Sequence, residues 1–204
     1  LSNAALILMK VELYEDSLAV YSKLLDIQPT NKKAQLNQAV ILSRMKRFDQ
    51  SIQQFEKLLI NDPENPVILW NLWSNYRNLW KQNIAIWYFY QALESDPDNE
   101  FILESLAKAL AVMQRREELL VVYQDLEQLQ PDNIQLKYDI LTIYECLNYP
   151  ASVISEYIET IISIEGDSKF LLDKLWDLYV VLEQFENASD AFERSIEIDP
   201  SDSL

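Results

Sequence analysis

The side chains in this sequence that could do chemistry are mostly carboxylates. Pairs such as Glu117 with Glu118, and Asp173 with Asp177, have the residue types of a general acid and a general base. Such a pair catalyses only where a pocket gives its two members different environments. On a chain with a net charge of -16, these pairs are more typical of solvated helix faces. We therefore predict that this chain is not an enzyme and has no catalytic residues.

Other catalytic and ligand-binding groups are scarce. The 204 residues include no histidine, which excludes Ser-His and Cys-His nucleophilic pairs and the commonest transition-metal ligand. Cys146 is the single cysteine, so it cannot form an internal disulfide and is expected to be a free structural thiol. A single glycine leaves no glycine-rich phosphate loop. These counts predict no metal site and no cofactor.

Charge and hydropathy limit the classes of partner that this chain can bind. A surface this acidic repels the phosphate backbone, so we expect no nucleic-acid binding. No apolar run reaches the roughly 18 residues that a membrane-spanning helix needs, and the start of the sequence lacks the pattern of a signal peptide. We expect no membrane insertion and favour a cytoplasmic location.

The elements that position these side chains follow a repeat of 34 residues. Prolines, aromatic residues and Asn or Asp return in one register, and one extra residue after Asp167 delays the last repeat. The prolines are Pro29, Pro63, Pro97 and Pro131, with Pro200 continuing the signal. The Asn and Asp positions are Asn31, Asn65, Asn99, Asn133, Asp167 and Asp202. The aromatic ladder is Tyr21, Phe55, Phe89, Tyr123, Tyr157 and Phe192. A second ladder is Leu8, Leu42, Tyr76, Leu110, Tyr144 and Tyr179.

Each repeat has the apolar spacing of two helices. Apolar residues between Phe48 and Leu59 recur at intervals of three and four, which predicts one buried stripe. The Asn or Asp after each proline is a favourable N-cap for the first helix, and Pro66 occupies the favoured first helical position after Asn65. The sequence therefore predicts a helical hairpin in every repeat.

These features resemble the tetratricopeptide repeat family, whose units end in an Asp-Pro-x-Asn turn. The resemblance lies in residues 61–65, in residues 95–99, and in residues 185–188 together with Asp199 and Pro200. It implies an all-α fold: an α-solenoid, a right-handed superhelix of about six hairpins, in a single domain over residues 1–204. The expected repeats are 1–31, 32–65, 66–99, 100–133, 134–168 and 169–204. No polar capping helix follows the last repeat, so the uncapped ends could contact a second copy or belong to a longer array.

In this family the first helices of the hairpins line a concave groove that binds an extended peptide. The resemblance implies that eight residues of this sequence face the groove: Lys33, Asn37, Arg44, Trp70, Asn71, Arg77, Lys108 and Tyr138. Their charges make the first half of the groove basic, whereas Glu145, Asp173 and Asp177 make the second half acidic. We expect such a groove to select a peptide by its charge order.

Asparagines also recur in this groove, at Asn3, Asn37 and Asn71. They resemble the ladder that holds peptide main chain in the repeats of O-linked N-acetylglucosamine transferase, although such residues can also tie neighbouring helices together. The carboxylate clamp of chaperone-binding members is absent, because Leu36 and Val40 occupy its positions.

A dense aromatic stretch ends at Trp87, Tyr88, Phe89 and Tyr90. Phe89 belongs to the core ladder, and the other three cannot all share its stripe. We therefore expect a convex aromatic patch of Trp87, Tyr88 and Tyr90 that binds a partner, with packing against neighbouring helices as the alternative.

Taken together, the sequence predicts a non-catalytic scaffold that binds a protein, as an extended peptide or a partner helix, in the concave groove. Two alternatives stay open. The segment could recruit substrates for a larger enzyme such as a glycosyltransferase, or it could be a structural solenoid that oligomerises through its ends.

Overall fold

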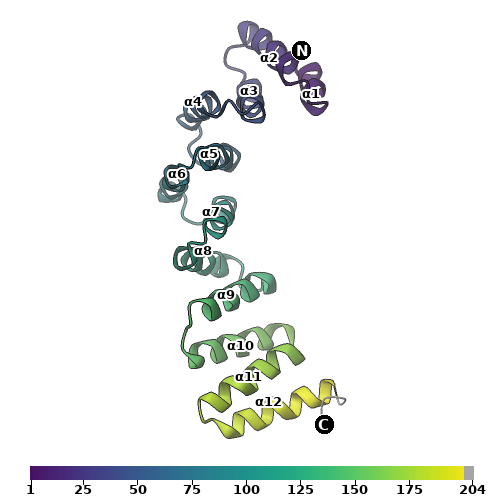
Figure 1. Ribbon diagram of the computed structural model, residues 1–204, viewed down its shortest axis with the longest axis vertical. Helices are drawn as coiled ribbons and strands as arrows, with labels where there is room; N and C mark the ends of the chain where they lie inside the picture. Colours follow the sequence, from purple (N-terminus) through teal and green to yellow (C-terminus); the bar gives the residue numbers. More distant parts are fainter. Residues whose placement is uncertain (200–204) are drawn as a thin grey trace. The chain divides into compact units, whose positions relative to one another are not determined.

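The computed structural model describes residues 1–199, and these residues are all-helical (Figure 1). Within this part of the chain lie twelve α-helices, two for each expected repeat. They are α1 (Ser2–Lys10), α2 (Tyr14–Ile27), α3 (Lys32–Arg44), α4 (Phe48–Leu59), α5 (Pro66–Asn78), α6 (Gln82–Ser95), α7 (Glu100–Val112), α8 (Arg116–Leu129), α9 (Ile134–Cys146), α10 (Ala151–Glu165), α11 (Lys169–Val181) and α12 (Phe185–Ile198). The predicted α-solenoid of helical hairpins is confirmed. Pro200 and Asp202, which continued the repeat signal, lie outside the described residues.

The chain forms two compact units, Leu1–Ala109 and Leu110–Leu204, which we call the N-terminal and C-terminal units. In the N-terminal unit each of the helices α1 to α5 packs against the next one along the chain, up to α6. In the C-terminal unit the helices from α8 to α12 do the same. The expectation of one domain over residues 1–204 stays a prediction.

The asparagines that follow the prolines cap the first helices as expected. Asn31 accepts a hydrogen bond from the amide of Ala34 at 3.0 Å, and Asn65 accepts from Ile68 at 3.2 Å. Asn99 and Asn133 do the same for α7 and α9. Each bond satisfies an amide that the helix itself leaves unpaired, so the repeated asparagines fix where the first helices begin.

The expected cap at Asp167 is wrong. The N-cap of α11 is Ser168, which supplies no side-chain bond, and the carboxylate of Asp167 instead accepts hydrogen bonds from Arg194. This ion pair lowers the pKa of Asp167 below its ordinary value.

The expected place of the extra residue, after Asp167, is also wrong. The N-cap of the second helix moves from Arg115 in the fourth hairpin to Pro150 in the fifth, 35 residues later, so the extra residue lies in the turn before α10. Ser168, and not Asp167, is therefore the counterpart of Asn133.

A left-handed residue closes the turn inside every hairpin. The six residues are 34 apart except at the last step, and each has a φ between 54° and 62°. They are Glu12, Lys46, Trp80, Gln114, Asn148 and Glu183. In the third hairpin, for example, the amide of Lys81 reaches back to the carbonyl of Tyr76 at 2.8 Å. This bond defines a Schellman motif, and its acceptor in every hairpin belongs to the second ladder found in the sequence.

The aromatic ladder of the second helices is buried in the first three hairpins. Tyr21, Phe55 and Phe89 are fully buried between helices. Tyr123 and Tyr157 are partly buried, and Phe192 is 44% exposed and tilted against Trp176. The ladder is therefore a core in the N-terminal unit, whereas its expected last member is a surface residue.

Hydroxyl and carboxylate side chains tie successive hairpins together. The tyrosine hydroxyls of Tyr76 and Tyr179 donate to Glu56 and Glu159, respectively, and each of these tyrosines lies 20 residues after its partner. The hydroxyl of Tyr144 accepts a hydrogen bond from the side-chain amide of Gln124, which also lies 20 residues earlier. A recurrent bond from the second helix of one hairpin to the first helix of the next therefore fixes their register.

A buried polar network joins the second and third hairpins. Asn75, which is fully buried, accepts from the hydroxyl of Ser43 at 2.6 Å and donates to Ser51 at 2.9 Å. Ser51 in turn donates to the carbonyl of Ala39 at 2.8 Å. Because every group in this network has a partner, it stabilises one arrangement of α3, α4 and α5.

Replacing Asn75 with Ala should lower the free energy of unfolding by about 2 to 3 kcal/mol, because Ser43 would lose its partner inside the protein. Chemical denaturation followed by circular dichroism measures this loss. The matched control is Asn78→Ala, which removes an exposed amide bonded to Ser74 in its own helix. Equal losses in the two variants would show that the network adds nothing.

Stability should also fall at alkaline pH. Burial and the hydrogen bond to the Glu159 carboxylate raise the pKa of Tyr179 to about 12. Since the folded pKa lies above the unfolded value of about 10, this contribution is complete below pH 10 and is lost between pH 10 and 12. Tyr179→Phe should flatten the fall in the denaturation midpoint over this range, whereas Tyr149→Phe should leave it in place. A fall as steep in Tyr179→Phe as in the parent chain would contradict this assignment.

Candidate functional site

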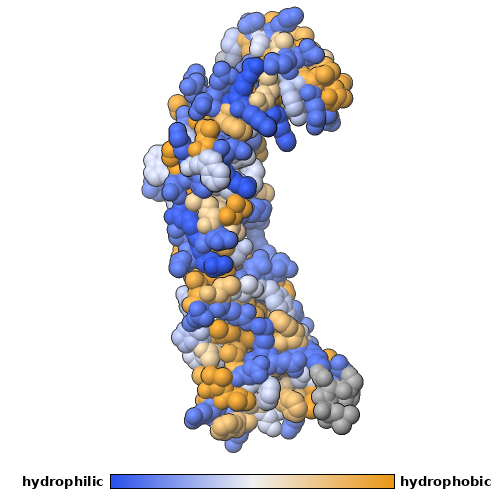
Figure 2. Space-filling view, in the orientation of Figure 1, coloured by the Kyte–Doolittle hydropathy of each residue, from blue (hydrophilic) through white to orange (hydrophobic). Residues whose placement is uncertain are grey.

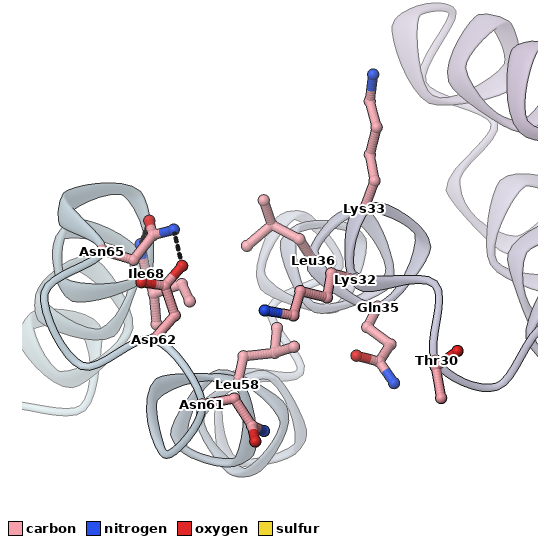
Figure 3. Close-up of a pocket in the computed structure, with 10 residues that line it drawn as sticks. All are labelled: Thr30, Lys32, Lys33, Gln35, Leu36, Leu58, Asn61, Asp62, Asn65 and Ile68. Atoms are coloured by element: carbon pink, nitrogen blue, oxygen red, sulfur yellow. Dashed lines mark hydrogen bonds between the residues drawn. The ribbon is translucent and has the colours of Figure 1, made fainter.

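A pocket of about 480 Å³ opens between α3, α4 and α5 in the N-terminal unit (Figure 3). We call it the α3–α5 pocket. Its lining residues are Thr30, Lys32, Lys33, Gln35, Leu36, Leu58, Asn61, Asp62, Asn65 and Ile68. They come from the beginnings of α3 and α5, the end of α4 and the turns beside them. The capping asparagines and prolines that set these helix ends therefore also position the pocket.

The pocket has apolar walls and a polar rim. Leu36 and Leu58 extend toward the hollow from α3 and α4, and Ile68 faces them from α5 (Figure 3). Lys32 reaches in beside Leu58, whereas Lys33 extends away from the hollow. A site of this kind suits an apolar side chain that is flanked by polar or acidic groups.

The charges around the pocket are unevenly satisfied. Within residues 1–199, neither Lys32 nor Lys33 has a carboxylate within 4.0 Å. Asp62, on the opposite wall, accepts a hydrogen bond from the amide of Asn65 at 2.8 Å. Two lysines against one engaged carboxylate leave the rim positive on a chain that is acidic as a whole.

Two of the lining side chains differ from their counterparts in the next repeat. Gln35 and Leu36 stand where the next repeat, 34 residues later, has Leu69 and Trp70. Leu69 is buried, and the Trp70 ring stacks on Trp73 at 4.7 Å. Gln35 is instead drawn to the preceding loop, where its side-chain amide donates to the carbonyl of Pro29 at 2.7 Å.

A second hollow of about 410 Å³ adjoins the pocket and shares Gln35, Leu58 and Asn61 with it. It reaches toward the end of α2, and its other lining residues are Leu25, Asp26, Pro29, Gln38, Gln54 and Lys57. The side-chain oxygen of Gln54 is buried and has no hydrogen-bond partner within residues 1–199. The two hollows together could hold a short extended segment with more than one side chain.

Five of the predicted groove residues do not converge on the α3–α5 pocket. Asn37 donates to the hydroxyl of Tyr21 at 2.8 Å, and Asn71 donates to the carbonyl of Val67 in its own helix. Lys108 pairs with Glu104, while Arg44 is exposed. Tyr138, in the C-terminal unit, donates to Glu165, and with burial this raises its pKa to about 12. Asn37 thus makes the helix-to-helix contact that was the alternative to ligand binding.

Two other predicted groove residues meet on α5. Trp70 stacks on Trp73, and the guanidinium of Arg77 lies 5.4 Å from the centre of the Trp73 ring. Trp73 is almost completely buried, so it supports the more exposed Trp70 and Arg77. This stack gives the first-helix side of the third hairpin a cationic, aromatic surface. Of the eight predicted groove residues, Lys33 lines the pocket.

The expected acidic half of the groove is partly neutralised. In the C-terminal unit Glu145 pairs with Lys174, and Asp173 accepts a hydrogen bond from Ser195. Both residues remain exposed. We therefore take the N-terminal unit as the better candidate site.

The predicted convex aromatic patch divides in the structure. Trp87 is 55% exposed and Tyr90 is also exposed. Tyr88 is partly buried, donates to Glu56 at 2.9 Å and packs edge-on against Trp87. Hydrophobic residues also reach the surface at several separate places on the face shown in Figure 2. A role of this patch in binding stays a prediction.

Sequence reasoning did not select the residues that form most of the pocket. Leu58, Asn61 and Asp62 lie at the end of α4 and in the following turn, outside the first helices on which the family groove is built. The sequence did contain a signal for the pocket: Gln35 and Leu36, which are smaller or polar, occupy the positions of Leu69 and Trp70 one repeat earlier.

The fold and its repeated turns define an α-solenoid of helical hairpins. A tetratricopeptide repeat model matches residues 177–202, in the last hairpin. No curated protein has a sequence that matches the chain. Among the described residues, no helix is both long and apolar enough to cross a membrane.

Solved structures share the fold at low sequence identity. A tetratricopeptide repeat protein from Parabacteroides merdae has a TM-score of 0.54 and 16% identity, over 97% of this chain and 77% of that one. MamA from Desulfovibrio magneticus RS-1 has a TM-score of 0.51 and 14% identity, over 86% and 98%. YrrB, described as a tetratricopeptide repeat protein with an unusual peptide-binding site, has a TM-score of 0.54 and 15% identity, over 89% and 93%. With the match in the last hairpin, these structures support a tetratricopeptide repeat protein with divergent repeats.

Proposed function

We propose that the chain is a non-catalytic scaffold whose N-terminal unit binds an extended, acidic segment of a partner protein. The observation that carries this proposal is the α3–α5 pocket, which combines apolar walls with two lysines that lack ion pairs within residues 1–199. An apolar side chain of the segment would enter between Leu36, Leu58 and Ile68. Neighbouring carboxylates would then lie near the lysine ammonium groups.

Electrostatics favour an acidic segment over a basic one at this place. The lysines of the rim would gain carboxylate partners while staying near solvent, where such pairs contribute modestly and weaken with salt. Most of the binding energy would therefore come from burial of the apolar side chain, and the charges would select the partner. The peptide-binding description of YrrB agrees with a role of this kind.

The stack of Trp70, Trp73 and Arg77 offers a second contact for the same segment. Trp70 stands one period after Leu36, so it occupies the corresponding place on the next first helix. A segment that leaves the pocket along the first-helix side of this unit would meet this aromatic and cationic surface. Recruitment for a larger enzyme would use the same surface, whereas end-to-end oligomerisation would not.

Filling the pocket should weaken binding. The double change Gln35→Leu with Leu36→Trp installs the residues of the next repeat. It should lower the affinity for a labelled peptide of glutamates and leucines by about tenfold or more. Fluorescence anisotropy measures the affinity, and circular dichroism checks that helicity is kept. The control is Gln128→Trp, which adds a tryptophan at an exposed position of α8.

An unchanged affinity in the filled variant, with helicity intact, would sink the pocket as the binding site. Failure of the parent chain to bind the peptide at all would sink the proposed function.

Reversing the rim charges tests the electrostatic part separately. Lys32→Glu with Lys33→Glu should lower the affinity for the glutamate and leucine peptide by about three- to tenfold at low salt. The difference in affinity between parent chain and variant should shrink as salt is raised. A titration at two ionic strengths provides the measurement. The control is Lys23→Glu with Lys10→Glu, which changes the net charge equally at exposed positions outside the pocket. Equal weakening by both pairs would mean that only the overall charge matters.

A further inference from the structure

The turn between α5 and α6 holds a tryptophan in an unfavourable conformation. Trp80 has a φ of 60°, in the left-handed region that bulky side chains avoid. The corresponding residue is polar in each of the other five hairpins: Glu12, Lys46, Gln114, Asn148 and Glu183. Asparagine, which stands there in the fifth hairpin, tolerates this conformation better than tryptophan does. The fold alone therefore gives no reason for tryptophan at this place.

Burial does not compensate for this conformation. Trp80 is 88% exposed. The exposed side of α6 continues the apolar surface with Ile84 and Trp87, which are three residues apart and so share a helix face. Rigid aromatic side chains at a surface are frequent anchors of protein interfaces.

Basic side chains occupy this turn and the corresponding turn of the preceding hairpin. Lys81 follows it directly and is exposed. The preceding hairpin contributes Arg44 and Lys46 from the end of α3 and its turn, and the 2.6 Å bond between Ser43 and Asn75 holds that end of α3 against α5. Within residues 1–199, none of these three cations has a carboxylate within 4.0 Å.

This concentration of free cations is local. Residues 1–109 carry 11 basic and 13 acidic side chains, a net charge of -2, whereas residues 110–204 carry 6 and 20, a net charge of -14. At the turn edge the nearest acidic residue in the sequence is Asp49, at the start of α4. Cations without protein partners, beside exposed aromatic rings, complement a partner that carries carboxylates and a flat apolar group.

We infer that Trp80, Ile84, Trp87, Arg44, Lys46 and Lys81 form a second docking surface, which we call the turn edge. Its partner is an acidic protein segment with an aromatic side chain: the ring packs on Trp80, and the carboxylates pair with the three cations. The turn edge lies at the ends of α3 and α5, whereas the α3–α5 pocket lies at their beginnings. Helices of 13 residues separate the two sites by about 18 Å.

A second copy of the chain would also supply carboxylates, but it would bring a net charge of -16 with it. Repulsion between two such molecules opposes self-association. We therefore assign the turn edge to a different protein.

The experiment replaces Trp80 with Asn, the residue of the fifth hairpin. The probe is a labelled peptide of glutamates interrupted by tyrosines, and its affinity is measured by fluorescence anisotropy for the parent chain, for Trp80→Asn and for Lys46→Glu with Lys81→Glu. We expect both variants to bind the probe about tenfold or more weakly than the parent chain does. Trp80→Asn should melt at the same temperature as the parent chain or at a higher one. Loss of binding without loss of stability separates a docking residue from a structural one.

The matched control is Gln114→Asn, which makes the corresponding change at the left-handed position of the fourth hairpin and should leave the probe affinity unchanged. An equal affinity in Trp80→Asn, or a lower melting temperature with no change in binding, would overturn the inference. So would a parent chain that fails to bind the probe, or whose sedimentation shows self-association that Trp80→Asn abolishes, because the edge would then serve a second copy.

Discussion

The structure depends on side-by-side packing of helices that cannot bury their apolar stripes alone. From α1 to α6 and from α8 to α12 each helix contacts its neighbour along the chain, and the left-handed turn inside each hairpin fixes how the two helices meet. The turn ends the first helix with a Schellman motif whose acceptor comes from the same repeat position every time. Since this local geometry recurs in all six hairpins, the variation that could support binding is confined to side chains.

Much of this architecture could be predicted because it follows from local rules. A period of 34 residues, capping asparagines and apolar stripes define where helices begin and which face is buried. One extra residue was visible in the sequence, but it lies in the turn before α10 and not after Asp167. The cap at Asp167 was wrong because the carboxylate has a stronger partner in Arg194, 27 residues away in the sequence. A contact over that distance carries no local signal.

The candidate sites were harder to predict, for two physical reasons. A pocket forms where side chains leave space unfilled. Gln35 and Leu36 indicate such a space only when they are compared with Leu69 and Trp70 in the next repeat. The left-handed turns carry no glycine, so Trp80 could not be recognised as a strained residue from its type alone. Asn37 shows that a residue type suited to binding can serve the fold instead. Its side-chain amide could hold a peptide, but it bonds to Tyr21.

The two candidate surfaces share one property that follows from the repeat. A solenoid gives every hairpin the same places to fill, so a residue that departs from its counterparts without serving the packing has been retained for another reason. Gln35 and Trp80 are such departures in opposite directions. Gln35 is polar and lines a hollow where Leu69, Leu103 and Leu172 are buried, and Trp80 exposes a large ring where its counterparts are polar. Both are accompanied by cations that have no carboxylate within 4.0 Å in residues 1–199, although the chain as a whole is acidic. In the C-terminal unit, by contrast, Lys137, Lys174 and Arg194 are each paired with carboxylates, so these three basic side chains serve the fold. Five cations with no carboxylate within 4.0 Å in residues 1–199 therefore lie at these two surfaces, which is an arrangement that an acidic partner can use.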